Sequence, residues 1–259
     1  MSQLDHDRYH AELQAETARF AEAVHDPDPA APVPTCPEWT LAQLTAHVGF
    51  GHRWAAVIVE RRAATPVPHE QVDDLRVPAG AEDRSSWLLA GARRLSHAVR
   101  EAGPQAGVWT WADDQTAGFW LRRIAHDTLV HRLDAELAVG REVRLAPDCV
   151  SDLFDMFSIL PRIDDFPALA ELRGHGQTLH FHATDPGLGD AGEWLARRTP
   201  SGVAWRHGHG RGDAALRGPA LDLLLVLSRR AALDGSQVEV SGDPRLLAHW
   251  LEHSRLEPA

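Results

Sequence analysis

The sequence contains no lysine and no asparagine, so all 26 of its basic residues are arginines. Without a lysine amine, the chain cannot form the Schiff base of a pyridoxal-phosphate enzyme or supply the lysine of a phosphate-binding loop. Lysine and asparagine have AT-rich codons, whereas the abundant alanine, arginine, glycine and proline have GC-rich codons. The missing residues therefore indicate a high-GC genome, and the exclusive use of arginine does not by itself point to a function.

Cysteine, positive charge and long apolar runs are also scarce. Two cysteines in 259 residues are too few for a disulfide scaffold and favour a reducing compartment. No run approaches the roughly 18 apolar residues of a membrane span, and the first residues form no apolar signal segment. The net charge of −11 does not suit non-specific nucleic-acid binding. We therefore expect a cytoplasmic protein that binds neither a membrane nor nucleic acid.

Histidine is abundant, with 16 residues, and a hydrophobic content of 44% is ordinary for a globular protein. A chain of 259 residues is long enough for two domains, each with its own core. The chemistry left to the chain is that of histidine, carboxylate and arginine side chains.

The first half of the sequence has the apolar periodicity of helices. Four helices are predicted, over residues 4–25, 40–62, about 85–103 and about 116–139. A proline-rich run ends the first helix, and Thr40 with Gln43 forms a capping-box pattern at the start of the second, after a turn over Thr35–Trp39. Helices of this length joined by loops predict a four-helix bundle, in whose core metal sites are often built.

In the second half, apolar residues alternate with period two, which is typical of strands. A short helix is predicted over residues 147–160. The later elements are predicted as strands within 177–185, 192–208 and 213–218, a buried helix over 221–233, a strand over 238–242 and a helix over 244–256. We therefore predict a two-domain α+β protein, with a bundle over 1–142, an inter-domain helix or linker over 143–169 and a small α+β domain over 170–259.

One group of residues has the spacing of metal ligands. Asp127 and His131 are four residues apart and so project from the same face of the fourth helix. His47 interrupts the apolar stripe of the second helix and should point into the bundle. Two histidines and a carboxylate are the ligand set of a catalytic zinc site, although iron, nickel or manganese would also suit them. His52 and His126 are alternative ligands, and all of these residues could instead form hydrogen bonds in the core.

The first half of the chain resembles the N-terminal domain of the mycothiol-dependent maleylpyruvate isomerase family, in TCPEWTLAQLTAHVGFGHRWAAVIV and FWLRRIAHDTLVHRLDAE. That domain is a branch of the DinB-like metal-binding bundles. The second half is similar to the family's C-terminal domain, a sterol-carrier-like α+β module, in GEWLARRTPSGVAW, ALRGPALDLLLVLSRR and VEVSGD. The resemblance covers nearly the whole chain and implies a DinB-like four-helix bundle followed by a small sterol-carrier-like domain.

The resemblance implies roles for four residues. In the family, the positions of His47, Asp127 and His131 bind zinc, but glutamate is common at the position of Asp127. The loss of one methylene shortens the reach of this ligand by about 1.3–1.5 Å. The family's C-terminal domain contributes an arginine near the end of its helix to the active-site cleft, which implies that Arg229 holds an anionic substrate. The resemblance also implies mycothiol, the thiol of high-GC Gram-positive bacteria, as the cosubstrate.

The leading hypothesis is a zinc-dependent, mycothiol-using enzyme that acts on a small electrophilic, anionic substrate, as an S-transferase or as a cis–trans isomerase. A thiol in the open zinc position would lose its proton and could attack an electrophilic carbon. One alternative is a metal-dependent hydrolase, for which no general base is evident. Another is a metal- or small-molecule-binding module without catalysis, such as a sensor or carrier. We expect a monomer or a small homo-oligomer.

Further histidines lie in the second half. His180 and His182 share one face of a predicted strand, and His207 and His209 lie in a glycine-rich loop. Each pair could begin a second metal site, but without a third ligand we interpret these histidines as surface residues. Cys36, at the predicted turn, is interpreted as a packing residue.

Overall fold

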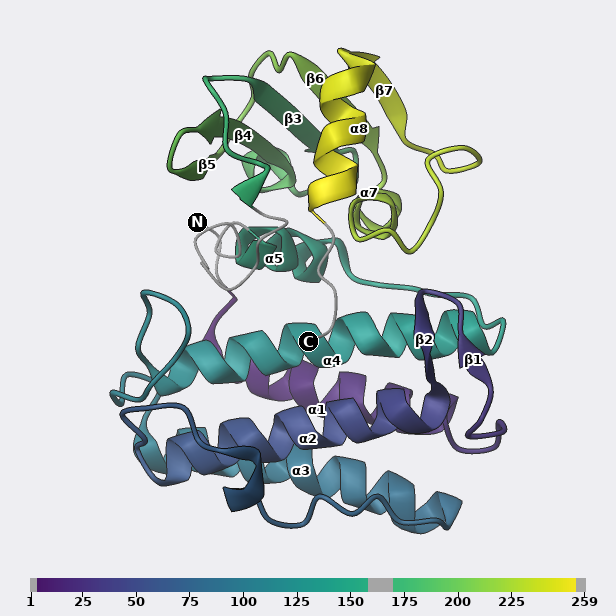
Figure 1. The fold of residues 1–259 in the computed structure, drawn as a ribbon, viewed down its shortest axis with the longest axis vertical. Helices are drawn as coiled ribbons and strands as arrows, with labels where there is room; N and C mark the ends of the chain where they lie inside the picture. The colour runs from purple at the N-terminus through teal and green to yellow at the C-terminus, as the bar shows by residue number, and fades with distance from the viewer. Residues whose placement is uncertain (1–3, 158–169, 255–259) are drawn as a thin grey trace. The chain divides into compact units, whose positions relative to one another are not determined.

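The chain forms two compact units in a computed structural model that describes residues 4–157 and 170–254 (Figure 1). The first unit spans Leu4–Val143 and is built of helices, and the second begins at Arg144 and contains a sheet with helices. The predicted α+β fold class, a helical bundle followed by a small α+β domain, is confirmed. The end of the helix predicted over 147–160 and much of the predicted linker lie outside the described residues.

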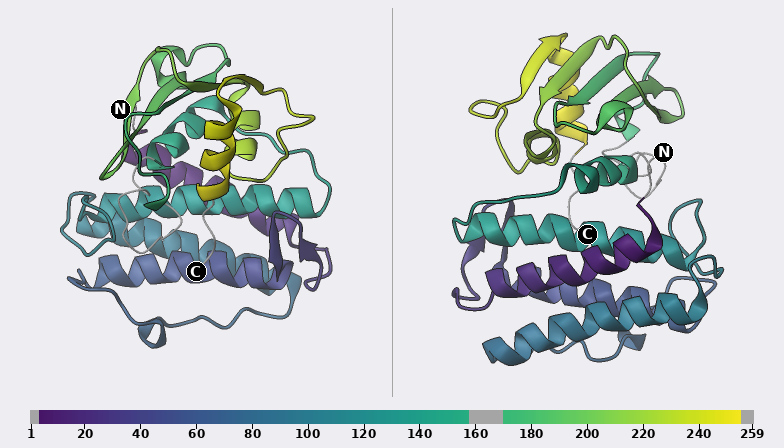
Figure 2. Two further views of the ribbon diagram at one scale, coloured as in Figure 1. Left: turned by 45° about the horizontal axis from the view of Figure 1, so that its top comes forward. Right: turned by 180° about the vertical axis from the view of Figure 1, so that it is seen from behind.

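Four long helices form the first unit, and Figure 2 shows the bundle from two further directions. The helices are α1 His6–Ala23, α2 Leu41–Glu60, α3 Ala81–Ala102 and α4 Ala117–Ala138. Both α1 and α2 pack against α3 and against α4, which encloses a core of side chains such as Phe20, Leu44 and Leu88. Three helices begin within two residues of the predicted positions, whereas α3 begins about one turn early, because Glu82 and Asp83 suit a first helical turn.

The helix ends follow the signals in the sequence. The Oγ1 of Thr40 accepts a hydrogen bond from the amide of Gln43 while the Gln43 side chain accepts from the Thr40 amide, so the predicted capping box is present. Asp5 and Thr116 cap α1 and α4 in a similar way. Gly103 ends α3 with a φ of 82°, a left-handed conformation that glycine adopts without a steric cost.

The segment before α2 differs from the sequence prediction. We predicted a turn over Thr35–Trp39, but β2 (Cys36–Thr40) is a strand that pairs in antiparallel fashion with β1 (Pro32–Val33). Val33 and Cys36 face inward and are buried, which anchors this short ribbon on the core. The ribbon contacts both α2 and α4. It therefore fixes the start of α2 relative to α4.

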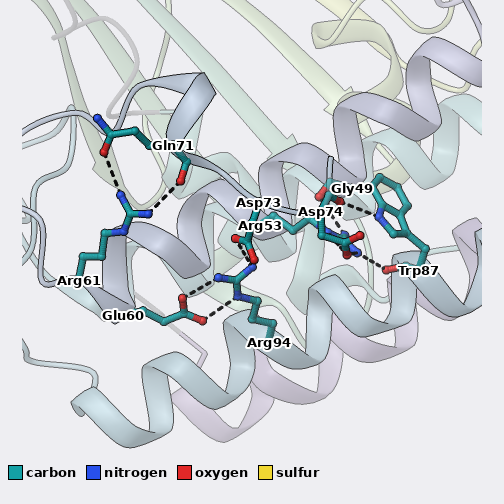
Figure 3. A network of polar contacts seen from close by, with 9 residues as sticks. All are labelled: Gly49, Arg53, Glu60, Arg61, Gln71, Asp73, Asp74, Trp87 and Arg94. Atoms are coloured by element: carbon teal, nitrogen blue, oxygen red, sulfur yellow. Dashed lines mark hydrogen bonds and ion pairs between the residues drawn. The ribbon is translucent and has the colours of Figure 1, made fainter. Parts of the chain in front are cut away.

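The long connection between α2 and α3 includes the short helix η1 (His69–Gln71) and is held by arginines (Figure 3). The buried Arg53 guanidinium donates to Asp74 Oδ2 at 2.7 and 3.0 Å and to the carbonyl oxygen of Trp87 at 3.0 Å. Its Cζ also lies 4.0 Å from the centre of the Trp87 ring, in a cation–π contact. Arg94 binds Glu60 and Asp73 at 2.8 Å. Arginine suits these positions because one planar group donates to several acceptors.

The second unit contains a five-stranded sheet in the order β5-β4-β3-β6-β7, in which β3 and β6 are parallel and the other pairs antiparallel. Its strands are β3 Thr178–Ala183, β4 Glu193–Thr199, β5 Gly202–His207, β6 Ala214–Gly218 and β7 Glu239–Gly242. Its helical segments are α5 Pro147–Phe157, η3 Gly189–Gly192, α7 Ala220–Leu227 and α8 Pro244–His253. The strands and the last helix lie where alternation and amphipathic spacing predicted them.

One face of this sheet is covered by helices. Leu179 and Phe181 of β3 are fully buried, α7 contacts β3 and β6, and the Trp250 ring of α8 lies 5.7 Å from that of Phe181. The opposite face carries polar side chains. Helix α5, which lies in the segment predicted as linker, packs on α7 and groups with the second unit.

Helix α7 is shorter than predicted. The helix expected over 221–233 ends at Leu227, and Arg229 has a φ of 62°, which a continuing helix does not permit. Although α7 is apolar apart from Asp222, it has only eight residues. Across residues 4–157 and 170–254, no helix combines the length and the apolar character that crossing a membrane would require.

The Arg53 contacts predict a large effect on stability. Arg53→Ala leaves Asp74 and the Trp87 carbonyl without their donor and removes the cation–π contact, so we expect the free energy of unfolding to fall by about 2–3 kcal/mol. Arg61→Ala is the matched control, because exposed Arg61 contacts only the neighbouring Gln71 among the residues drawn in Figure 3, and it should cost less than about 0.5 kcal/mol. Urea denaturation followed by helical circular dichroism measures both, and equal losses would contradict this role.

Candidate metal centre

The three predicted ligands lie together in the bundle. His47 projects from α2, while Asp127 and His131 project from α4, and one ligand atom of each lies within 4.8 Å of the other two. His47 Nε2 is 3.4 Å from Asp127 Oδ2, and His131 Nε2 is 3.9 Å from Asp127 Oδ1. The two imidazole rings are 4.8 Å apart. Two helices that are distant in the sequence thus bring the three side chains to one point.

Charges around Asp127 keep its carboxylate ionised. Burial would raise the pKa of this carboxyl, but Arg123, His131 and His47 together hold the pKa well below its usual range. The Arg123 guanidinium lies one turn away on α4, with Nη1 at 2.9 Å from Asp127 Oδ1. An anionic oxygen between two imidazoles is a ligand arrangement that attracts a divalent cation.

His131 is oriented by a second carboxylate that the sequence analysis missed. Its Nδ1 lies 2.9 Å from Oδ2 of Asp134, whose side chain is fully buried. Because a carboxylate accepts hydrogen bonds, Nδ1 donates, and Nε2 is left for a metal. Thr35 donates to Asp134 Oδ1 at 2.5 Å, and the Cys36 thiol lies 3.7 Å from Oδ2. The spacing of three between His131 and Asp134 was visible in the sequence, but the burial of Asp134 was not.

Trp39 forms a wall beside the two histidines. Its ring stacks on His131 at a centroid distance of 5.9 Å and lies 4.8 Å from the ring of His47. Trp39 belongs to β2, the strand that the sequence analysis predicted to be a turn. The same short strand therefore supplies Trp39 and Cys36, and Thr35 precedes it. Cys36 packs in the core cluster, where it also contacts Asp134.

The two alternative ligands lie in other surroundings. His52 Nε2 is 2.9 Å from Thr128 Oγ1, and the ring is fully buried. The buried ring of His126 meets Tyr9 edge-on at 6.1 Å. Neither belongs to a cluster of potential ligands in the part of the chain that the structure describes.

The distances at His47, Asp127 and His131 fit a small divalent ion. With metal–ligand bonds of about 2.0–2.2 Å, two ligand atoms of a tetrahedral site lie about 3.3–3.6 Å apart. The 3.4 Å between His47 Nε2 and Asp127 Oδ2 falls in this range. His131 Nε2 lies 3.9 Å from the other carboxylate oxygen, Oδ1, so a small rotation of the Asp127 carboxylate or the His131 ring would be needed for all three side chains to bind one ion. The aspartate in place of glutamate therefore still brings its carboxylate to His47, in spite of the shorter side chain.

Arg229, the predicted substrate residue, lies in the second unit. It is exposed, follows the end of α7, and donates from Nη1 to the carbonyl oxygen of Leu251 in α8 at 3.0 Å. Its side chain is thus exposed, with one guanidinium nitrogen held by the backbone of α8.

The fold and the candidate metal centre define the class: a helical bundle with a group of potential metal ligands between two of its helices, followed by a small α+β domain. Residues 10–136 match the family described as the mycothiol maleylpyruvate isomerase N-terminal domain, and residues 144–249 match the C-terminal domain of the same family. The chain belongs to the mycothiol-dependent maleylpyruvate isomerase family, as its motifs indicated.

Solved structures agree with this fold. The chain is similar to the crystal structure of the mycothiol-dependent maleylpyruvate isomerase, with a TM-score of 0.59 and 14% identity over 93% of this chain and 97% of that one. A mutant of that enzyme gives a TM-score of 0.57 at 15% identity, with the same coverage. No curated protein sequence matches the chain.

The burial of His52 predicts a pH dependence of stability. Burial lowers the pKa of His52 to about 4, whereas in the unfolded chain it is about 6.5. Between these two pKa values the unfolded chain binds more protons than the folded chain does. The free energy of unfolding is therefore unaffected by His52 above about pH 6.5 and decreases as the pH falls below it. Between pH 7 and pH 5, the titration of this histidine should lower the free energy of unfolding by about 2 kcal/mol.

The measurement is urea denaturation at several pH values in this window. His52→Gln should reduce the loss of stability between pH 7 and pH 5 by about that amount, because glutamine does not titrate. His97→Ala, a change at an exposed histidine of α3, should keep the full loss. A profile for His52→Gln that parallels the unchanged protein would show that His52 is not buried as a neutral ring.

Proposed function

We propose that the protein is a mycothiol-using enzyme with a zinc ion held by His47, Asp127 and His131. The observation that carries this proposal is the convergence of two imidazoles and one ionised carboxylate within 4.8 Å between α2 and α4. Membership of a family whose solved relative is a mycothiol-dependent isomerase supports the choice of thiol. Zinc is chosen over other metals because two histidines, a carboxylate and an open position are typical of catalytic zinc sites.

When bound, the metal would lower the pKa of a thiol in its open position, so that a thiolate is available near neutral pH. The side chains around it have separate tasks. Arg123 keeps the Asp127 carboxylate ionised, Asp134 fixes the orientation of His131, and Trp39 excludes water from one side of the histidines. These contacts hold the ligands in place before substrate arrives, which reduces the reorganisation needed during the reaction.

The proposed reaction is the attack of the thiolate sulfur on an electrophilic carbon–carbon double bond. In an isomerase, the new C–S bond leaves a single bond that rotates, and the sulfur then departs as thiolate to restore the double bond. In an S-transferase, the adduct takes up a proton and is released. The substrate is proposed to be a small anion, for which exposed Arg229 offers a fork of donors.

Metal content and turnover of His47→Ala test the proposal. We expect the full-length variant to lose one equivalent of metal relative to the unchanged protein, and to lose at least about 99% of its turnover with mycothiol and a panel of unsaturated acids. His97→Ala, with an exposed histidine changed on α3, should retain both. Unchanged metal content in His47→Ala would exclude this site. Retention of metal without turnover of any electrophile in the unchanged protein would instead favour the non-catalytic binding module.

Asp134→Asn tests the orientation of His131 without removing a ligand. The amide has the shape of the carboxylate but no charge, so the metal affinity should fall about 10- to 100-fold. Thr35→Val, which removes only the hydrogen bond from Thr35 to Asp134, should have a smaller effect. Zinc titration against a competing chelator measures both affinities. Equal affinities in Asp134→Asn and the unchanged protein would show that Asp134 supports the fold alone.

A further inference from the structure

A second group of potential metal ligands lies on the polar face of the sheet in the second unit. Along β3, Leu179 and Phe181 point to the helix-covered face and are fully buried. Side chains of a strand alternate, so His180 and His182 point to the opposite face. Nothing in the proposed thiol chemistry uses these histidines.

Glu193, the first residue of β4, brings a carboxylate to this pair. It stands directly opposite His182 in the antiparallel register of β3 and β4. Its Oε2 lies 2.9 Å from His180 Nε2, and its Oε1 lies 3.8 Å from His182 Nε2. The third partner that these histidines lacked in the sequence analysis is therefore present, and it comes from the neighbouring strand.

His209 completes the group from the loop between β5 and β6. Its Nδ1 lies 2.8 Å from the same Oε2 of Glu193, and its ring is 5.4 Å from that of His180. Two glycines allow this loop to approach the sheet, because a side chain at either position would collide with it. A Cβ on Gly210 would lie 2.4 Å from Leu195 Cδ1, and a Cβ on Gly212 would lie 2.8 Å from the backbone nitrogen of His180. The glycine-rich loop is thus shaped to hold His209 over the sheet.

His209 does not pair with His207, the residue with which the sequence analysis grouped it. His207 does not join His209, because its Nε2 lies 2.6 Å from Asp155 Oδ1 and its Nδ1 is 3.2 Å from the carbonyl oxygen of Asp190. The cluster instead joins a histidine of β3 to a histidine of the loop, with a carboxylate between them. Sequence spacing could not indicate this, because the three ligands come from three different segments.

The protonation states suit metal ligands. Burial lowers the pKa of His180, against the opposing effect of Glu193, which favours the neutral ring. Burial would raise the pKa of Glu193, but His209, His182 and His180 lower it overall. A neutral imidazole and an ionised carboxylate are the forms in which these side chains bind metals.

We propose that His180, Glu193 and His209 form a second binding site for a divalent transition metal, with His182 as an additional ligand. One ligand atom from each of the three lies within 4.8 Å of the others, and the donor set of imidazoles and one carboxylate suits zinc. The contacts of 2.8 and 2.9 Å to Glu193 must widen by about half an ångström around an ion. The His209 side chain, which is 78% exposed, is free to make that shift.

An ion would have access to this site. A hollow of about 640 Å³ borders His180 and is lined on its other sides by residues that include Gly210, Arg211, Asp213 and Ser241. His182, whose Nε2 lies 3.8 Å from Glu193 Oε1, is available for a fourth coordination position.

The experiment uses the full chain with the bundle ligands removed, as His47→Ala/His131→Ala, and zinc alone as the probe. After metal is stripped, isothermal titration should show one zinc equivalent bound in this background. Adding His209→Ala or Glu193→Gln should weaken that binding at least tenfold, since loss of a ligand costs no less than loss of its outer partner. His209 is exposed, so its removal leaves the fold intact even if a change at buried His180 does not.

His175→Ala is the matched control, because His175 is an exposed histidine of the same unit outside the cluster, and it should leave the affinity unchanged. Absence of a zinc equivalent in the His47→Ala/His131→Ala background would overturn the second site, as would equal binding with and without His209. Neither result bears on the bundle site, because that site is tested by the metal content of the His47→Ala variant alone. Either proposal can therefore be contradicted without the other.

Discussion

The ionised carboxylate of Asp127 is the constraint on which the proposed metal centre depends. It lies on α4, faces His47 on α2 at 3.4 Å, and is held as an anion by Arg123 in the preceding turn. An isolated anion that is partly shielded from water is unfavourable, and the Arg123 guanidinium, 2.9 Å away, compensates for that cost. A divalent cation would do so more completely. The packing of α2 against α4 and the chemistry of the site are therefore coupled through one side chain.

The short ribbon of β1 and β2 supports that contact from outside. It places Trp39 against both histidines, and Thr35 beside the buried carboxylate of Asp134. Asp134 in turn fixes the ring of His131. Thr35 and Trp39, which precede Asp127 by about ninety residues in the sequence, thus support the side chains of α4. Loss of such an outer contact typically lowers metal affinity about 10- to 100-fold.

The sequence predicted the helices and the ligand trio because both depend on local spacing. The capping box at Thr40 and the spacing of Asp127 and His131 are each features of one helix. His47 was predicted because it interrupts the apolar stripe of the second helix, and the family resemblance pointed to the same three residues. The sequence did not reveal the strand at Cys36–Thr40, because its stability comes from pairing with β1 and burial against the bundle. The burial of Asp134 also depends on tertiary packing, which a single spacing of three does not disclose.

The second unit shows the same limit. Alternation predicted its strands, but not which faces and loops meet, so His209 was paired with His207 and its actual neighbour Glu193 was not considered. The helix that leads to Arg229 was predicted to be too long. Its apolar sequence pattern does not show that the backbone turns at Arg229, whose positive φ is incompatible with a continuing helix. Histidine clusters built from strands and loops are visible only once the register is known.

The most direct test of the central claim is a cobalt titration of the metal-stripped full chain, followed by addition of mycothiol. Cobalt reports its ligands through its visible absorption. If the bundle site activates the thiol, mycothiol should change the spectrum of the unchanged protein, and the change should disappear in His47→Ala and persist in His209→Ala. A spectrum that mycothiol leaves unaltered, in protein that holds cobalt at His47, Asp127 and His131, would contradict the proposed function.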